Sequence, residues 1–242
     1  MNIKGVLTII VIIIILYYLY SYFFSDGSST IVKTHDARSL KIIKGDTLPA
    51  GITADYTFSI WIYVNDWNYR FGETKVVFGR TDKDKMPAPS VTLGETNNEL
   101  SVTLGVYPSN TSGSGSENGP SSGNIFTCGI KDVPLQRWTN LIMSLNNRAL
   151  DMYLDGKLVK TCMLPGVPKM NPTSELMITP DGGFSGYVSN FKYYPKAVNP
   201  SKAYDIYKSG YGGGSALGSL FNKYRLKLAF MEDNKEVNSL EI

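Results

Sequence analysis

Residues 5–24 read GVLTIIVIIIILYYLYSYFF and carry no charged side chain. An α-helix rises about 1.5 Å per residue, so a segment of this length spans roughly 30 Å, the thickness of the hydrocarbon core of a bilayer. A secretory signal peptide has a shorter apolar stretch, of about 7 to 15 residues, and Ser25 and Gly27 offer it only a weak cleavage pattern. We therefore expect residues 1–25 to form a single transmembrane anchor, with residues 5–24 in the lipid bilayer.

The charges beside this segment predict its orientation. Lys4 precedes it, whereas Lys33, Arg38, Lys41 and Lys44 follow it. Because positively charged residues are retained preferentially on the cytoplasmic side of a membrane, we expect the large domain that follows to lie on that side.

The remaining chain, residues 26–242, is long enough for one sizeable domain with its own core. The whole sequence has 24 Lys and Arg against 21 Asp and Glu. Domains that bind nucleic acid usually concentrate basic residues on one surface, and this balance gives no sign of such a surplus. We expect no nucleic-acid partner.

Alternation of apolar and polar residues dominates this remaining part. In the segment DYTFSIWIYVNDW, every second side chain is apolar: Tyr56, Phe58, Ile60, Ile62 and Val64. A period of two residues is typical of a strand with one buried face, and similar short segments recur as far as residue 194. Regularly spaced strands separated by turn residues predict an all-β fold, an antiparallel sandwich or barrel.

The clearest local signal is the hairpin sequence RALDMYLDGKLVKTC. Asp155 and Gly156 suit a two-residue turn in which both central residues have positive φ. The register that follows pairs Met152 with Val159, Tyr153 with Leu158, and Asp151 with Lys160.

Two Gly-rich stretches help to divide the chain. Residues 108–124, PSNTSGSGSENGPSSGN, have no large apolar side chain, so we expect an exposed loop between two strands. A surface insertion and a loop that orders against a partner both fit it. The predicted organisation is an anchor over 1–25, a linker over 26–37, a β-sandwich over 38–210, and a Gly-rich linker with a C-terminal hairpin over 211–242.

One helix is predicted outside the anchor, in NPSKAYDIYKSG. Asn199 suits the N-cap, Pro200 the first helical position and Gly210 the end of the helix.

The C-terminal segment alternates apolar residues with the basic residues Lys223, Arg225 and Lys227, and we expect it to form a hairpin that turns near residues 233–234. Its basic side fits either a solvated strand face or a contact strand for an acidic partner or lipid headgroups.

Residues suited to catalysis are scarce. His35 is the only histidine, and it follows the anchor, where a solvated linker residue is the ordinary interpretation. The sequence has no phosphate-binding loop of the G-x-x-x-x-G-K-[ST] type, and no carboxylates spaced like the pair of a β-sandwich glycosidase. We expect neither enzyme activity nor a cofactor.

The sequence leaves alternatives open for calcium binding and for the state of the two cysteines. Asp181, with backbone carbonyls of TPDGGFSG, could supply oxygen ligands to calcium, but a turn that needs the flexibility of two glycines explains the same residues. Cys128 and Cys162 lie on separate predicted strands. They form either a disulfide or buried thiols, and thiols are the rule in a reducing compartment.

Four segments together resemble the concanavalin A-like, laminin-G-like jelly-roll superfamily: YTFSIWIYVNDW, VPLQRWTNLIMSL, LDMYLDGKLVKTC and GGFSGYVSNFKYYPKAVNPSKAYDIYKSG. The resemblance covers residues from about 38 to 210 and implies a jelly-roll sandwich. The glycosidase motif of catalytic relatives is absent, and the calcium-binding acids of lectin relatives cannot be matched residue by residue. The resemblance therefore implies the fold without those activities.

The combination of a membrane span, this domain, a Gly/Ser-rich insertion and two cysteines also resembles proteins of large nucleocytoplasmic DNA viruses, such as chlorella viruses. That resemblance implies a minor capsid protein, a single-pass protein of the virion's inner membrane whose β domain lies on the capsid side. Its partners would be other capsid proteins.

Two functions follow as hypotheses. The first is a membrane-anchored structural or interaction protein of this kind. The second is a lectin-like adhesion domain that binds carbohydrate, in which Trp67, in the predicted loop NDWNYRFG, stacks on a sugar ring. Trp61 and Trp138 lie inside predicted strands, so we expect both in the core.

Overall fold

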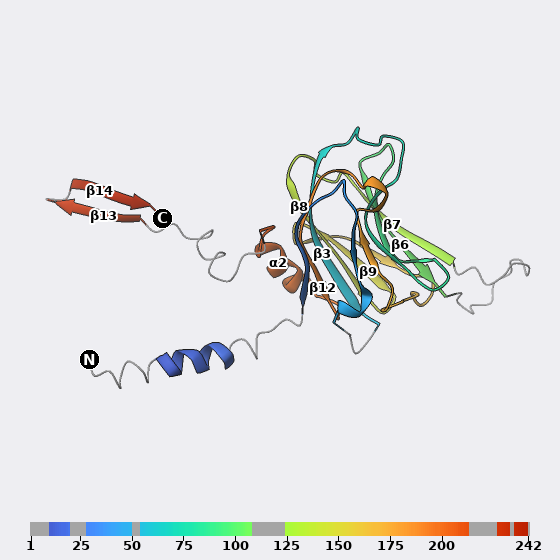
Figure 1. Ribbon diagram of the computed structural model, residues 1–242, viewed down its shortest axis with the longest axis horizontal. Helices are drawn as coiled ribbons and strands as arrows, with labels where there is room; N and C mark the ends of the chain where they lie inside the picture. Colours follow the sequence, from blue (N-terminus) through green and yellow to red (C-terminus); the bar gives the residue numbers. More distant parts are fainter. Residues whose placement is uncertain are drawn as a thin grey trace, which may run out of the picture.

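The computed structural model describes residues 10–19, 28–49, 54–107, 124–212, 227–232 and 235–241. Its main body is a sandwich of two six-stranded antiparallel sheets (Figure 1). The first sheet has the strand order β1-β12-β3-β8-β9-β10 and the second β2-β11-β4-β5-β6-β7. The strands are β1 Ser29–Asp36, β2 Lys41–Ile43, β3 Tyr56–Asp66, β4 Lys75–Thr81, β5 Pro87–Leu93, β6 Glu99–Val106, β7 Asn124–Lys131, β8 Trp138–Asn146, β9 Ala149–Leu154, β10 Lys157–Met163, β11 Leu176–Ile178 and β12 Ser185–Tyr194. The predicted all-β sandwich is confirmed.

The facing sides of the two sheets form one hydrophobic core. The alternate residues of β3 predicted to point inward, Phe58, Ile60, Ile62 and Val64, are each at most 1% exposed. Phe58 lies against Phe78 of the second sheet, with ring centroids 5.2 Å apart. Because burying one such side chain contributes about 1.5–3 kcal/mol, the alternation fixes which face of each strand turns inward.

The predicted turn between β9 and β10 is present. Asp155 and Gly156 have φ of 48° and 74°, and Tyr153 lies opposite Leu158. A bulge at Val159 then shifts the register by one residue. Alternation alone does not reveal an extra residue, and β10, an edge strand with mostly exposed side chains, has little burial to fix its register.

The bulge makes two predicted cross-strand pairs wrong, because Met152 and Asp151 lie opposite Lys160 and Thr161. Asp151 accepts a hydrogen bond from Thr161 Oγ1 at 2.6 Å. Lys160 instead reaches the other sheet, where its Nζ donates to the carbonyl oxygen of Gly129 at 2.6 Å.

Strand β1 lies where the sequence predicted a linker over 26–37. It pairs with β12 from Ser29 opposite Tyr193 to Asp36 opposite Tyr187, and His35 belongs to it. Val32 is the buried residue of the strand, at 3% exposure. An edge strand that buries one side chain lacks the alternation by which the other strands were recognised.

The last residue of the predicted exposed loop over 108–124 belongs to a strand, because Asn124 is the first residue of β7. It lies opposite Val106 of β6, so hydrogen bonding to that strand extends β7 into the polar stretch. Residues 108–123 lie outside the described residues.

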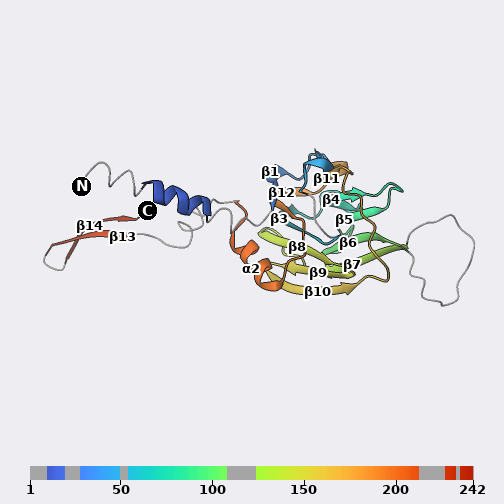
Figure 2. The same ribbon diagram turned by 90° about the horizontal axis from the view of Figure 1, so that it is seen from below.

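Helix α2, Pro200–Lys208, covers part of the outer face of the first sheet (Figure 2). Asn199 is its N-cap, as predicted: the side chain accepts a hydrogen bond from the backbone N–H of Lys202 at 2.8 Å. Ala203 and Ile206 pack with four residues of the sheet and its following loop into a second, smaller core: Ile142, Tyr153, Tyr194 and Val198.

Of the predicted anchor, residues 10–19 are helical and each of them is exposed. Within the described part of the chain, no helix is both long and apolar enough to cross a membrane. Residues 1–9 and 20–25 of the predicted anchor lie outside that part.

The C-terminal segment contains a two-stranded antiparallel sheet of β13, Lys227–Glu232, and β14, Lys235–Glu241. Lys227, one of the three basic residues of the predicted contact strand, lies opposite Glu241. Lys223 and Arg225 lie outside the described residues.

Candidate functional site

A row of side chains crosses four neighbouring strands of the first sheet on its outer face. Tyr187 of β12 lies opposite Asp36 of β1 on one side and opposite Tyr63 of β3 on the other. Tyr63 in turn lies opposite Trp138 of β8, with ring centroids 5.6 Å apart. Directly opposed residues of antiparallel strands point to the same side of a sheet, so these four side chains form one strip. We call Asp36, Tyr187, Tyr63 and Trp138 the aromatic row.

Tyr211 extends the aromatic row beyond Trp138. The two rings stack with centroids 4.9 Å apart and an interplanar angle of 6°. Two side chains of β12 hold the backbone of residues 210 and 211 by hydrogen bonds. Ser189 Oγ donates to the carbonyl oxygen of Tyr211 at 2.7 Å, and Asn190 Nδ2 donates to the carbonyl oxygen of Gly210 at 2.6 Å. The stacked ring is therefore held in place from the sheet below.

The aromatic row is open to solvent. Tyr187 and Tyr211 are each 49% exposed, and Tyr63 and Trp138 are half-buried. Aromatic residues that expose a ring and hold it rigidly are enriched where proteins bind other molecules, because they give a large contact area at low entropic cost.

Beside Tyr187 the surface is hollowed over about 170 Å³, lined by Asp36, Arg38, Asn65, Ser185, Gly186 and Tyr187. The lining combines a carboxylate, an amide, a guanidinium and a hydroxyl with an aromatic ring. Ligand sites usually join a few placed polar groups to an aromatic surface, in volumes of about 300–1,000 Å³. The hollow is smaller than this range and lies at the Tyr187 end of the aromatic row.

Arg38 is the charged donor of this hollow. Its Nη2 donates to Ser185 Oγ at 2.8 Å, and its guanidinium carbon lies 5.2 Å from the centroid of the Tyr69 ring. None of the ion pairs among the described residues involves Arg38. The guanidinium is thus oriented by neutral groups and keeps donors for an acceptor on a ligand.

Trp67, the sugar-stacking residue predicted from the sequence, lies outside the aromatic row. It is half-buried against the hydrophobic core, and the ammonium of Lys75 lies 5.2 Å from its ring centroid. Lys75 is 1% exposed, and burial lowers the pKa of its ammonium. The structure therefore gives the Trp67 ring a place in packing and in a cation–π contact rather than in the aromatic row.

Of the other two tryptophans, both predicted in the core, Trp61 is buried as predicted, whereas Trp138 is half-buried. Trp61 is 6% exposed, but it lies on the outer face beneath α2 and stacks on Tyr207 at 5.6 Å. Trp138 belongs to the half-exposed aromatic row. Trp61 lies on the outer face because its neighbours Ile60 and Ile62 point into the core, and Trp138 because Leu141, three residues further along β8, points inward.

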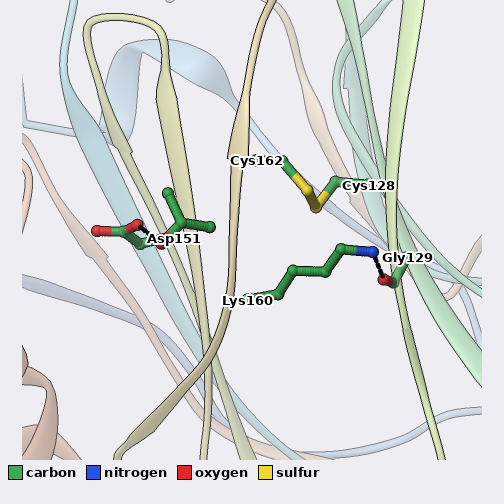
Figure 3. Close-up of a disulfide and its surroundings, with 6 residues drawn as sticks. Cys128, Gly129, Asp151, Lys160 and Cys162 are labelled. Atoms are coloured by element: carbon green, nitrogen blue, oxygen red, sulfur yellow. Dashed lines mark hydrogen bonds between the residues drawn. A yellow bond between two sulfur atoms is a disulfide. The ribbon is translucent and has the colours of Figure 1, made fainter.

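Cys128 and Cys162 form a disulfide between the two sheets, with Cα atoms 6.3 Å apart (Figure 3). Cys128 belongs to β7 and Cys162 to β10, which are edge strands of the second and first sheet. The hydrogen bond from Lys160 to Gly129 lies beside the disulfide and joins the same two strands. A disulfide and a hydrogen bond therefore join the two sheets at this edge of the sandwich.

The described residues contain no group of three His, Cys, Asp or Glu side chains placed to hold a metal ion. Asp181, the calcium candidate, is exposed on the short 3₁₀ turn Pro180–Gly182. Asp155 is engaged by the ion pair with Arg137 and by the backbone N–H of Asn140 at 2.9 Å.

Sequence reasoning missed Tyr187, Tyr63 and Arg38 as site residues. Their proximity depends on the pairing of β1 with β12 and of β12 with β3, strands far apart in the sequence. A usable signal is the second face of β3, where Trp61 and Tyr63 alternate with core residues. Large aromatic residues on both faces of one strand indicate that the outer face is also covered or used.

This sandwich of two antiparallel sheets has the concanavalin A-like architecture. The family model of the concanavalin A-like lectin/glucanases superfamily matches residues 26–203, and the chain belongs to this superfamily. No curated protein matches the chain.

Solved structures of the same fold include binding domains of botulinum neurotoxins. The receptor-binding domain of the C/D mosaic serotype is 10% identical, with a TM-score of 0.55 over 72% of this chain and 41% of that chain. The binding domain of neurotoxin DC in complex with SialylT is 13% identical, with a TM-score of 0.52 over 75% of this chain and 42% of that chain. This chain thus spans less than half the length of these structures, and at such identities the likeness concerns the fold alone.

Proposed function

We propose that this protein is a membrane-anchored binding module without enzyme activity, in which the apolar N-terminal segment is held in a bilayer and the aromatic row contacts a partner. The observation that supports a binding role is the row itself, with Tyr187 and Tyr211 half exposed and Trp138 stacked beneath. Tyr, Trp and Arg are the residues most enriched among the strongly contributing residues of interfaces.

The partner that we propose is a structural protein, and the setting is a virion. The protein would be a minor capsid protein that links the inner membrane to the protein shell, with its β-sandwich on the capsid side. The uncharged N-terminal segment and the resemblance to proteins of large nucleocytoplasmic DNA viruses support this finer assignment. An interface of this kind needs no catalytic group.

Deleting residues 1–24 tests the anchor. We expect the full chain to float with membranes in a density gradient and the truncated chain to remain in the soluble fraction, because a span of about twenty apolar residues inserts almost irreversibly. Near-UV circular dichroism of the truncated chain shows whether the sandwich is folded. A chain lacking residues 213–242 but keeping the N-terminal segment is the control and should still float. A folded truncated chain that still floats would contradict the anchor.

Carbohydrate binding is the second candidate, and the hollow beside Tyr187 favours it. Arg38, Asp36 and Asn65 offer both donors and acceptors beside an exposed ring, which suits the many hydroxyl groups of a sugar. A structure with the same fold, the binding domain of neurotoxin DC, was solved in complex with SialylT.

A glycan array distinguishes the two candidates. If the hollow binds sugar, Tyr187→Ala and Arg38→Ala should each weaken binding at least about tenfold, because each removes a contact worth about 1.4 kcal/mol or more. Tyr204→Ala removes another exposed tyrosine, on α2 outside the row, and should leave binding unchanged. Binding that depends on Trp67 but not on Tyr187 would refute this site, and no binding at all would favour a protein partner.

A further inference from the structure

Arg80 of β4 is a buried cation that has no charged partner among the described residues. It is 6% exposed, and none of the ion pairs found in the described ranges includes it. Its Nη2 donates to the carbonyl oxygens of Pro172 at 2.7 Å and Ser174 at 3.0 Å. Its Nε is buried and has no hydrogen-bond partner among the residues that the structure describes. A buried charge with an unused donor is unfavourable unless something compensates it.

Two tyrosines of the first sheet lie beside Arg80. Tyr56 of β3 is 2% exposed and Tyr193 of β12 is 7% exposed. The Tyr56 hydroxyl, like Arg80 Nε, is buried without a hydrogen-bond partner in the described part of the chain. Burial raises the pKa of both phenols, so both stay protonated at neutral pH and keep a proton to donate.

Arg80, Tyr56 and Tyr193 line a common hollow of about 20 Å³. A polar cavity needs roughly 10–15 Å³ to hold one water-sized particle, so this one accepts a single small occupant. Its lining contains no Asp or Glu, and it is apolar except for these three residues and Asn171. Asn171 uses its side-chain oxygen to accept a hydrogen bond from Thr173 at 2.8 Å.

We propose that this hollow binds a small monovalent anion of the halide type, held by Arg80, Tyr56 and Tyr193. A water molecule would satisfy the donors but leave the charge of Arg80 uncompensated. A halide ion would satisfy the donors and also compensate the charge, because it accepts several hydrogen bonds and neutralises the guanidinium in surroundings of low dielectric constant.

The anion would connect side chains of both sheets. Arg80 belongs to the second sheet and both tyrosines to the first, and Arg80 also holds the carbonyl groups of residues 172 and 174. Occupancy should therefore stabilise this end of the sandwich, because an ion that binds the folded state alone shifts the unfolding equilibrium.

Thermal unfolding of the full chain in detergent tests the site. We compare sodium chloride or bromide with sodium gluconate at equal ionic strength and pH 7. At a halide concentration about ten times the Kd, the Tm should rise by roughly 3 °C or more. Tyr56→Phe keeps the ring and removes a donor, so it should lose most of this shift. Tyr153→Phe removes a buried hydroxyl that does not line this hollow and should keep the shift.

Bromide-soaked crystals give a measurement that is independent of the variants. An anomalous peak between Arg80 and Tyr56 would support the proposal. The proposal is overturned by equal Tm in halide and gluconate, by an equal shift in Tyr56→Phe and the wild type, or by a hollow that holds water in place of bromide.

Discussion

Reduction of the Cys128–Cys162 disulfide is expected to lower the free energy of unfolding by about 4 kcal/mol. The two cysteines are 34 residues apart, and a cross-link that closes a loop of this length restricts the unfolded chain by about that amount. In a domain of this size the loss corresponds to a fall in Tm of roughly 10 °C. Thermal unfolding with and without a reducing agent measures it directly.

The double variant Cys128→Ala, Cys162→Ala is the control for this experiment. It should unfold at about the temperature of the reduced wild type and should not respond to the reducing agent. The hydrophobic core between the sheets and the hydrogen bond from Lys160 to Gly129 do not depend on the disulfide, so the folded state should persist after reduction. If the wild-type Tm is the same in both conditions, the bond does not constrain the chain as the structure implies.

The disulfide also bears on where the domain resides. Disulfides persist in secretory compartments and at virion and cell surfaces and are rare in the cytosol, whereas the lysines and arginine after the N-terminal segment favour the cytoplasmic side. A domain that is made on the cytoplasmic side and oxidised in an assembled virion would satisfy both tendencies, which accords with the proposed role.

The features predicted correctly from the sequence are those that depend on neighbouring residues. The inner face of β3, the turn at Asp155–Gly156 and the N-cap Asn199 follow from alternation, positive φ and local hydrogen bonding. The strand β1, the bulge at Val159 and the aromatic row depend instead on which distant strands become neighbours. Such pairings are set by the packing of the complete sandwich, so a single sequence does not display them.

Substitution of Gly186 by alanine should destabilise the protein by about 3 kcal/mol and distort the aromatic row. A Cβ atom at this position would overlap the carbonyl oxygen of Tyr63, and the φ of +153° is unfavourable for other residues. Because the obstacle is backbone of the adjacent strand, it cannot move aside as a side chain could. Strand β12 must therefore shift away from β3 at Gly186, and Tyr187, the next residue, moves with it.

Gly79→Ala is the matched control, since Gly79 also lies in a strand but the nearest atom to an added Cβ is Ser90 Oγ at 3.4 Å. Urea unfolding should show a loss for Gly186→Ala that exceeds the loss for Gly79→Ala by about 2 kcal/mol or more. The same pair tests the binding face below the unfolding transition. Displacement of Tyr187 should weaken partner or glycan binding in Gly186→Ala alone, whereas undiminished binding by this folded variant would place the contact surface away from the aromatic row.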